Sequence, residues 1–128
     1  MNYDPTNIFA RILRGELPCQ KVYEDEFALA FHDIRPLAPI HVLVIPKGPY
    51  VALTDFAAKA PEPLIAGFWR AVAKTALLLG LEPGGYRIVS NAGENGGQIV
   101  FHMHVHIFGG RAMSGRMGNM PRGDEKKD

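Results

Sequence analysis

Three histidines alternate with apolar residues in residues 101–110, which read FHMHVHIFGG. Side chains point alternately to the two faces of a β-strand, so residues two positions apart share a face. A strand here would place the three imidazoles on one face, with neighbours roughly 6.5–7 Å apart. The apolar residues between them would point the other way, toward a core. The histidines are His102, His104 and His106, and the apolar residues are Met103, Val105 and Ile107.

A row of imidazoles is compatible with three kinds of site. Burying three together makes protonation mutually unfavourable and lowers their pKa values, which would leave at least one neutral and nucleophilic near pH 7. Histidine is also the commonest ligand of zinc, so the row could bind a metal ion. A strand whose histidines simply face water is the third explanation. The pattern alone leaves all three open.

The segment before the histidines favours catalysis on a phosphate. Residues 91–98 read NAGENGGQ. Glycines let backbone N–H groups approach an anion closely, and Asn91 and Gln98 add side-chain donors. A flexible hairpin loop would have a similar composition. Because the loop directly precedes the histidines, a phosphate held there would lie against them.

The other two histidines, His32 and His41, lie in the segment FHDIRPLAPIH. Asp33, between them, is a carboxylate at a predicted strand end, and it could accept hydrogen bonds from the vicinal hydroxyls of a ribose. A strand-end or turn cap is the alternative for Asp33. His41 begins a predicted strand, which is equally compatible with a surface position.

The elements that must position these groups follow from hydrophobic periodicity and turn residues. A short helix is expected to begin near Thr6 and to end at Gly15. A long helix is expected over residues 63–79, with Gly80 as its C-terminal cap. Strands are expected over residues 21–26, 27–34, 41–45, 86–90 and 100–108. Strands before and after one long helix indicate an α+β domain with a mainly antiparallel sheet.

Composition excludes several classes of function. The chain has 128 residues, 47% of them hydrophobic, which indicates one globular domain. A net charge of +1 and scattered basic residues give no reason to expect binding to nucleic acid or to a membrane surface. We find no signal-peptide pattern, and no apolar run approaches the roughly 20 residues that span a bilayer. The single cysteine, Cys19, cannot form an internal disulfide, so we expect a cytoplasmic protein.

Taken together, the motifs resemble the histidine triad (HIT) superfamily and, within it, the HINT branch of histidine triad nucleotide-binding proteins. HMHVHIF fits the signature His-x-His-x-His-x-x with an apolar residue at every x. The segments IFARILRGELP, LAFHDIRPLAPIHVLVIPK and GGQIVFHMHVHIFGGR also resemble this branch and occur in the expected order. The likeness covers roughly residues 6–111, which is most of the chain.

The resemblance implies a HIT-like fold: a five-stranded antiparallel sheet with one long and one short helix, extended across a homodimer. It implies a hydrolase that binds purine nucleoside monophosphates and cleaves nucleoside phosphoramidates, including adenylated amines such as AMP-lysine, without metal or other cofactor. The middle histidine would attack the α-phosphorus and form a nucleotidyl-histidine, from which water releases the nucleotide. By position this nucleophile is His104.

The same resemblance implies the other site residues. His106 would contact the phosphate, and His41 and His102 would support the nucleophile. The ribose-binding acid falls on Asp33. The remaining positions are Phe9, Ile12, Phe31 and Ile34 around the base, and Asn91, Gly97, Gln98 and Ile99 around the phosphate.

The sequence also departs from the family pattern. Ile99 stands where many members carry a hydroxyl residue directly after Gly-Gly-Gln, which affects the expected leaving-group preference. Asn7 and Ala10 replace a cysteine pair that forms part of a zinc site in some relatives, so no structural zinc is expected. The C-terminal tail is longer than in typical members and lacks their tryptophan. We expect residues 1–112 to form the domain and residues 113–128 to be a partly disordered tail.

Two other functions remain open. A sister HIT branch hydrolyses dinucleoside polyphosphates, although the ending Gly109-Gly110-Arg111 favours the HINT side. A nucleotide-binding or scaffold protein with vestigial catalysis is the alternative from another class, and the intact triad argues against it.

Overall fold

The fold is that of a computed structural model, which describes residues 1–113. The expected tail, residues 113–128, therefore lies outside the described residues apart from its first position. The helices are α1 (Ile8–Leu13), α2 (Leu53–Lys59) and α3 (Glu62–Leu78), and the strands are β1 (Lys21–Glu24), β2 (Ala28–His32), β3 (Ile40–Pro46), β4 (Arg87–Val89) and β5 (Val105–Gly109).

The five strands form one sheet in the order β1-β2-β3-β5-β4, and every neighbouring pair is antiparallel. The expected five-stranded antiparallel sheet is thus confirmed. The first three strands follow one another along the chain, and the last two return after the helices. This order places β5, which carries the end of the histidine segment, directly beside β3, which carries His41.

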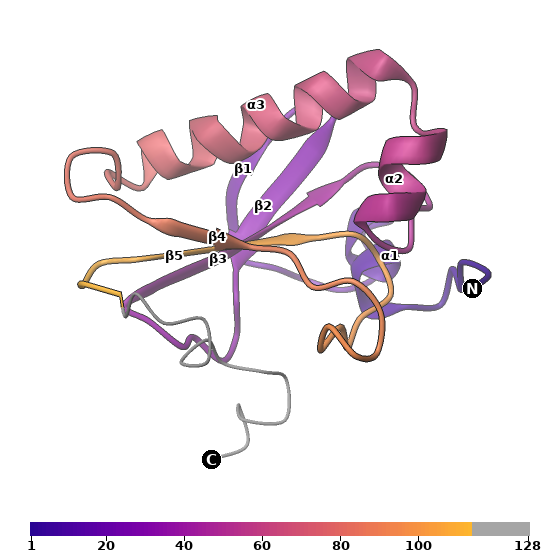
Figure 1. The fold of residues 1–128 in the computed structure, drawn as a ribbon, viewed down its shortest axis with the longest axis horizontal. Helices are drawn as coiled ribbons and strands as arrows, with labels where there is room; N and C mark the ends of the chain where they lie inside the picture. Colours follow the sequence, from indigo (N-terminus) through magenta and orange to yellow (C-terminus); the bar gives the residue numbers. More distant parts are fainter. Residues whose placement is uncertain (114–128) are drawn as a thin grey trace.

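The two faces of the sheet are covered differently. Helix α3 runs along one face (Figure 1), and the core beneath it contains the expected inward residues Met103, Val105 and Ile107. On the other face, Phe9 of α1 packs with a smaller apolar cluster of Leu29, Phe31, Leu43 and Ile45. Burying one large apolar side chain stabilises the fold by about 1.5–3 kcal/mol. The histidines lie on the α1 face: His106 alternates with the inward residues of β5, and the rings of His102 and His104 meet the ring of Phe9.

The long helix ends next to the glycine that the sequence predicts as its C-terminal cap. Gly80 follows the last helical turn with φ 72°, a conformation that favours glycine. The N–H of Leu81 donates to the carbonyl of Ala76 and that of Gly80 to Leu77, which satisfies two carbonyls of the last turn. The observed helix begins and ends one residue earlier than the expected range 63–79.

The prediction of only two helices was wrong, because the structure contains α2 as a third. The sequence signal for this helix is weak. Its N-cap, Ala52, makes no side-chain hydrogen bond, and Phe56 is its only buried residue. The start is instead stabilised by Asp55, whose carboxylate accepts from the N–H of Val51 over 2.8 Å. A helix with one buried position shows no periodicity that could predict it.

The prediction of a strand over residues 100–108 was wrong in its first half, since β5 begins only at Val105. Val105 pairs with Val44 of β3, so continued pairing would bring Met103 opposite Pro46. Proline has no N–H to donate to the ladder. The N–H of Met103 donates instead to the carbonyl of Tyr50 over 2.8 Å. His102 and His104 therefore lie before the strand, and only His106 lies within it.

Within residues 1–113, the structure contains no helix long and apolar enough to cross a membrane.

Candidate functional site

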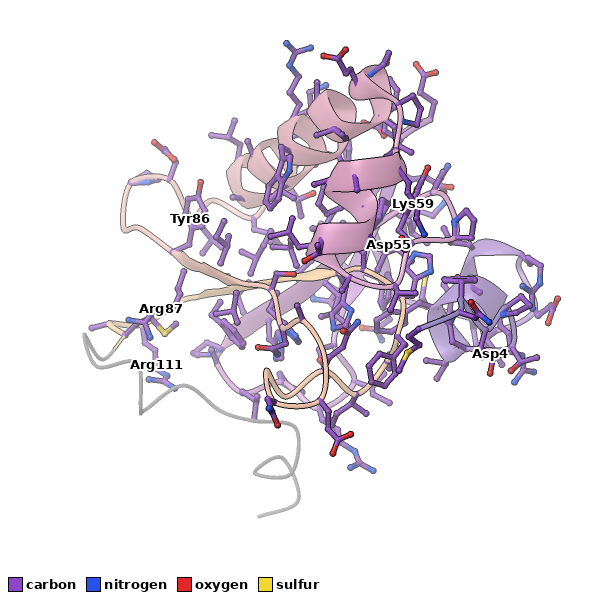
Figure 2. The ribbon with its side chains drawn as sticks, turned by 45° about the vertical axis from the view of Figure 1, so that its right-hand side comes forward. Asp4, Asp55, Lys59, Tyr86, Arg87 and Arg111 are labelled. Atoms are coloured by element: carbon purple, nitrogen blue, oxygen red, sulfur yellow. The ribbon has the colours of Figure 1, made fainter. Side chains whose placement is uncertain are left out.

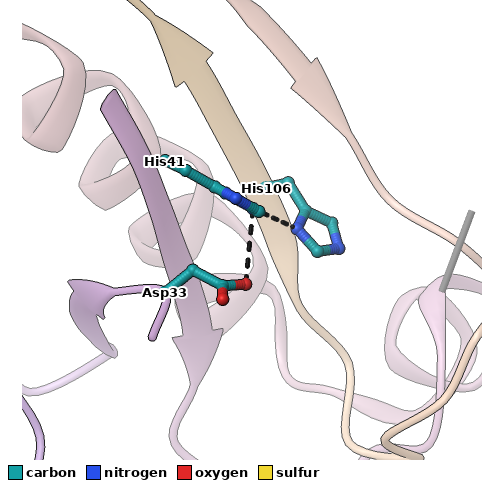
Figure 3. Close-up of side chains that lie close together, drawn as sticks. All are labelled: Asp33, His41 and His106. Carbon is teal, nitrogen blue, oxygen red and sulfur yellow. Dashed lines mark hydrogen bonds and ion pairs between the residues drawn. The ribbon is translucent and has the colours of Figure 1, made fainter. Parts of the chain in front are cut away.

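The adjacency of β3 and β5 brings two histidines together. His41 lies opposite Phe108 and Leu43 lies opposite His106, so the two histidines are diagonal neighbours on one face. His41 Nε2 is 2.9 Å from His106 Nδ1. Asp33 follows β2, and its Oδ2 lies 3.5 Å from His41 Nε2 (Figure 3). The surface alternative for His41 was wrong, because only 2% of this residue is exposed.

Hydrogen-bond partners assign the protons in this cluster. The backbone N–H of Leu37 donates to His41 Nδ1 over 3.1 Å, so Nδ1 of the neutral ring holds a lone pair. The proton is then on Nε2, which donates to His106 Nδ1. A neutral His106 in turn carries its proton on its own Nε2. This is the tautomer that presents an N–H, rather than a lone pair, at Nε2.

His104 has the opposite tautomer. Its Nδ1 lies 2.6 Å from the carbonyl oxygen of His102. A carbonyl can only accept, so Nδ1 carries the proton and Nε2 of the neutral ring holds the lone pair. The ring packs against two others, with centroids 5.0 Å from Phe9 and 5.1 Å from His106. Its backbone is held by Ser90, whose hydroxyl donates to the His104 carbonyl over 2.8 Å.

His102 is fully buried and bonded at both ring nitrogens. Its Nε2 donates to the carbonyl of Pro46 over 3.0 Å, and its Nδ1 lies 2.6 Å from the hydroxyl of Tyr3. Burial lowers the pKa of His102 to about 4, so this ring is neutral near pH 7. Both of its nitrogens face groups of the protein, which fits a supporting position better than direct contact with a ligand.

The predicted base-binding residues do not share one environment. Phe9 and Phe31 are buried and meet edge to face, with ring centroids 5.6 Å apart. Ile12 is partly buried and packs against the same cluster. Ile34 is 89% exposed beside Asp33. Its apolar side chain is therefore open to contact with a ligand whose ribose lies at Asp33.

Asp33 is oriented by its own turn. Its Oδ1 accepts from the N–H of Arg35 over 2.7 Å, while Oδ2 faces His41. The turn-cap interpretation is thus correct for one oxygen. The same carboxylate remains part of the histidine cluster, so the two interpretations of Asp33 are compatible.

The glycine-rich loop is held together mainly by Gln98. Its side-chain oxygen accepts from the N–H of Gly93 over 2.8 Å, and its Nε2 donates to the carbonyls of Val51 and Val100. Gln98 is buried, Asn91 and Gly97 are half-buried, and Ile99 is 63% exposed. The Gln98 amide therefore shapes the loop in this structure, rather than pointing its donors toward a ligand.

The geometry also bears on metal binding. Among the described residues, Asp33, His41 and His106 form one group whose ligand atoms all lie within 4.8 Å of one another. A metal ion requires lone pairs on its imidazole ligands. The Leu37 N–H assigns a proton to His41 Nε2, the atom that faces the cluster. The contacts therefore favour hydrogen bonding over metal binding here.

Sequence reasoning missed three groups that act on the histidines. They are the Tyr3 hydroxyl, the Pro46 carbonyl and the Leu37 N–H. Two are backbone groups, for which sequence carries no specific signal. Tyr3 is a side chain, but it lies 99 positions from the histidine that it contacts.

Comparison with known proteins places this geometry in a family. A family model described as the HIT domain matches residues 14–113. A HIT-like protein of 13.2 kDa from Azospirillum brasilense is 60% identical over 111 residues, which cover 87% of this chain and 91% of that protein. A HIT-like protein from Rickettsia prowazekii is 44% identical over 117 residues, which cover 91% of this chain and 98% of that protein.

Solved structures show the same fold. A HIT family hydrolase from Legionella pneumophila superposes with a TM-score of 0.80 at 41% identity, covering 86% of this chain and 97% of that one. A histidine triad nucleotide-binding protein from Candida albicans superposes with a TM-score of 0.72 at 28% identity, covering 88% of each chain.

Proposed function

The chain belongs to the HIT domain family, and we propose that it is a purine nucleotide-binding hydrolase that cleaves nucleoside phosphoramidates through a nucleotidyl-histidine intermediate. The observation that carries this proposal is the bond from His104 Nδ1 to the His102 carbonyl. It leaves the lone pair of the middle histidine on Nε2, which supports that nitrogen as the nucleophile. The similarity in sequence and fold to a HIT family hydrolase and to a histidine triad nucleotide-binding protein supports the same activity.

In the first step, His104 Nε2 attacks the α-phosphorus and a new P–N bond forms. The bond from phosphorus to the substrate amine breaks, and its electron pair leaves with the amine. The amine takes up one proton from the solvent, because the rings of the histidine cluster are neutral in the assigned tautomers and would become imidazolates if they supplied it. Positive charge develops on the His104 ring, so its bond to the His102 carbonyl strengthens as the reaction proceeds.

In the second step, water attacks the phosphorus of the nucleotidyl-histidine. The P–N bond to His104 breaks, the nucleoside monophosphate leaves, and the attacking water releases one proton to the solvent, which balances the proton taken up by the amine. Both displacements develop charge on the non-bridging oxygens. His106, whose Nε2 carries a proton in the assigned tautomer, is the residue we assign to these oxygens.

Binding of the nucleotide uses the surrounding elements. Asp33 accepts from the ribose hydroxyls, and Ile34 with the Phe9, Ile12 and Phe31 cluster lies on the base side. The loop of residues 91–98 holds the phosphate through Asn91 and Gly97. The side chain of Gln98 maintains the shape of this loop. No metal is required in this scheme. We place the enzyme in the cytoplasm as a homodimer, in keeping with its single cysteine and with the family resemblance.

The test is steady-state hydrolysis of adenosine phosphoramidate, with a dinucleoside polyphosphate assayed beside it. The wild type should hydrolyse the phosphoramidate with and without EDTA. His104→Ala should lower kcat by roughly three orders of magnitude or more, because a covalent nucleophile is lost. AMP binding by calorimetry should change little, since Asp33 and the loop remain.

The matched control is His32→Ala, which removes the exposed histidine of β2 and should leave turnover unchanged. Full activity in His104→Ala, or loss of wild-type activity with EDTA, would contradict the mechanism. Cleavage of the polyphosphate alone would assign the protein to the sister activity. AMP binding without any turnover would indicate a binding protein.

A further inference from the structure

We propose that Tyr3 is a positioning residue for the nucleophile, acting through His102. This inference rests on the proposed function, in which His104 attacks phosphorus. Tyr3 lies before α1 and outside the residues that the family model matches. Its hydroxyl lies 2.6 Å from His102 Nδ1, and its ring meets the His102 ring edge to face at 5.6 Å between centroids.

The direction of the hydrogen bonds is determined by the Pro46 carbonyl, which can only accept. His102 Nε2 therefore carries the proton and donates to it over 3.0 Å. Nδ1 of the neutral ring then holds a lone pair, and the Tyr3 hydroxyl must be the donor. The His102 ring is fully buried, so protein groups rather than water satisfy both of its nitrogens.

Tyr3 affects the nucleophile through the hydrogen bonds that orient His102. The segment before Val105 is not part of the sheet ladder. Its neighbour Met103 is held by a backbone bond to Tyr50, and the His102 ring is held by Pro46 and Tyr3. The His102 carbonyl, placed by these contacts, accepts from His104 Nδ1 over 2.6 Å. A looser His102 would let the His104 ring rotate or change tautomer.

The arrangement is stable over the neutral pH range. Burial lowers the pKa of His102 to about 4 and raises the pKa of Tyr3 above its usual value. The ring therefore stays neutral and the hydroxyl keeps its proton near pH 7. The donor and acceptor in this bond do not exchange roles under those conditions.

The test compares Tyr3→Phe with the wild type in the full chain. The substitution removes the hydroxyl and keeps the ring that packs on His102. We expect kcat for adenosine phosphoramidate to fall about five- to tenfold, the effect of one orienting hydrogen bond. KM should change less than about twofold, because Tyr3 acts on the nucleophile and not on the bound substrate. Nitrogen-15 NMR of the imidazoles should show His104 as a mixture of tautomers instead of a single Nδ1–H form.

Tyr23→Phe is the matched control. It also removes a tyrosine hydroxyl bond, the one to Asp25 Oδ2 at 2.8 Å, and Tyr23 packs against the core on the α3 side. It should leave kcat and the His104 NMR signals unchanged. Equal losses of kcat in the two variants, or wild-type kcat and a single His104 tautomer in Tyr3→Phe, would overturn the proposal.

The two hypotheses fail in different ways. If the wild type does not turn over phosphoramidates, the proposed function fails, and the NMR comparison of Tyr3→Phe with the wild type still decides whether Tyr3 orders His104. If the wild type is active and Tyr3→Phe matches it in kcat and in the NMR signals, the function stands and the positioning by Tyr3 fails.

Discussion

Four buried histidines differ in which ring nitrogens have hydrogen-bond partners, and therefore in where each ring carries its proton. His41 and His106 are linked ring to ring, His104 is tied to a backbone carbonyl, and His102 is bonded at both nitrogens. These partners leave a lone pair on Nε2 of His104, the atom that we propose as the nucleophile. The same partners place an N–H at Nε2 of His106. The folded chain alone thus contains one imidazole that offers a lone pair and one that offers an N–H, as the proposed mechanism requires.

Asp33 provides a first prediction at the residue scale. Asp33→Ala should weaken the binding of AMP more than that of 2′,3′-dideoxy-AMP, because only AMP has hydroxyls for the carboxylate to accept from. The loss of a hydrogen bond to a charged group costs about 1.5–3 kcal/mol. Calorimetric titration of both ligands measures this difference.

The matched control for this test is Glu24→Ala, on β1, where Glu24 pairs with Lys21 and Lys47. Neither ligand should bind more weakly to that variant. Equal weakening of both ligands by Asp33→Ala would mean that Asp33 acts only by orienting His41, 3.5 Å away.

His102 provides a second prediction, on stability. Its pKa falls from an ordinary value of 6.5 to about 4 on folding, so below pH 6.5 the unfolded chain binds the proton more readily. This contribution to stability is complete above pH 6.5 and is lost as the pH falls to 4, in total about 3 kcal/mol. His102→Gln, which cannot titrate, should lose less stability between pH 7 and pH 4 than the wild type in urea denaturation. The same pH dependence in both proteins would contradict burial as the cause.

At the scale of elements, the candidate site depends partly on segments that are neither helix nor strand. β5 begins after His104, and the loop of residues 91–98 is shaped by one side chain, Gln98, with three hydrogen bonds. Helix α1 contributes Phe9, whose ring packs against His104. The sheet positions His41 and His106, while individual contacts position His102 and His104.

The loop provides the prediction at this scale. Gln98→Met keeps most of the side-chain length but removes its hydrogen bonds, so the N–H of Gly93 and the carbonyls of Val51 and Val100 lose a partner. We expect AMP binding to weaken several-fold while adenosine binding changes little, because the loop contacts the phosphate. Amide exchange in residues 91–98 should become faster. Gln20→Met, at an exposed position, is the control; unchanged AMP affinity in Gln98→Met would show that the loop does not hold the phosphate.

At the scale of the whole molecule, the two edges of the sheet differ. β1 carries charged residues, and its Glu24 forms ion pairs with Lys21 and Lys47 at 2.6 and 2.7 Å. Such an edge resists pairing with another sheet. The β4 edge carries Ile88, 46% exposed, and follows Tyr86, 38% exposed. Tyr86 and Arg87 lie at the outer margin of the molecule, away from Asp4 (Figure 2).

These differences predict which edge joins two subunits. We expect a homodimer through β4, with the exposed Leu77 and Leu78 at the end of α3 covered as well. Light scattering at micromolar concentration should show a dimer for the wild type and a monomer for Ile88→Lys. Leu53→Lys makes the same change at an exposed apolar position on α2 and should remain a dimer. A monomeric wild type would exclude this assembly.

The sequence correctly predicted the features that depend on local patterns. Alternation placed Met103, Val105 and Ile107 in the core, and helical periodicity and Gly80 located α3. These signals lie within a few residues of the element that they predict. Helix α2 was missed because only one of its residues is buried, and the start of β5 was misplaced because it depends on Pro46 in another strand.

The protonation pattern of the site could not be predicted in this way. It depends on contacts between distant positions, such as Tyr3 with His102, Pro46 with His102, and His41 with His106, which lie 99, 56 and 65 residues apart. Which nitrogen of an imidazole carries the proton depends on the donor or acceptor that faces it. The packing of the sheet and of the N-terminal segment determines which donor or acceptor faces each nitrogen. The sequence therefore singles out the histidines, and the folded arrangement assigns each nitrogen its proton or its lone pair.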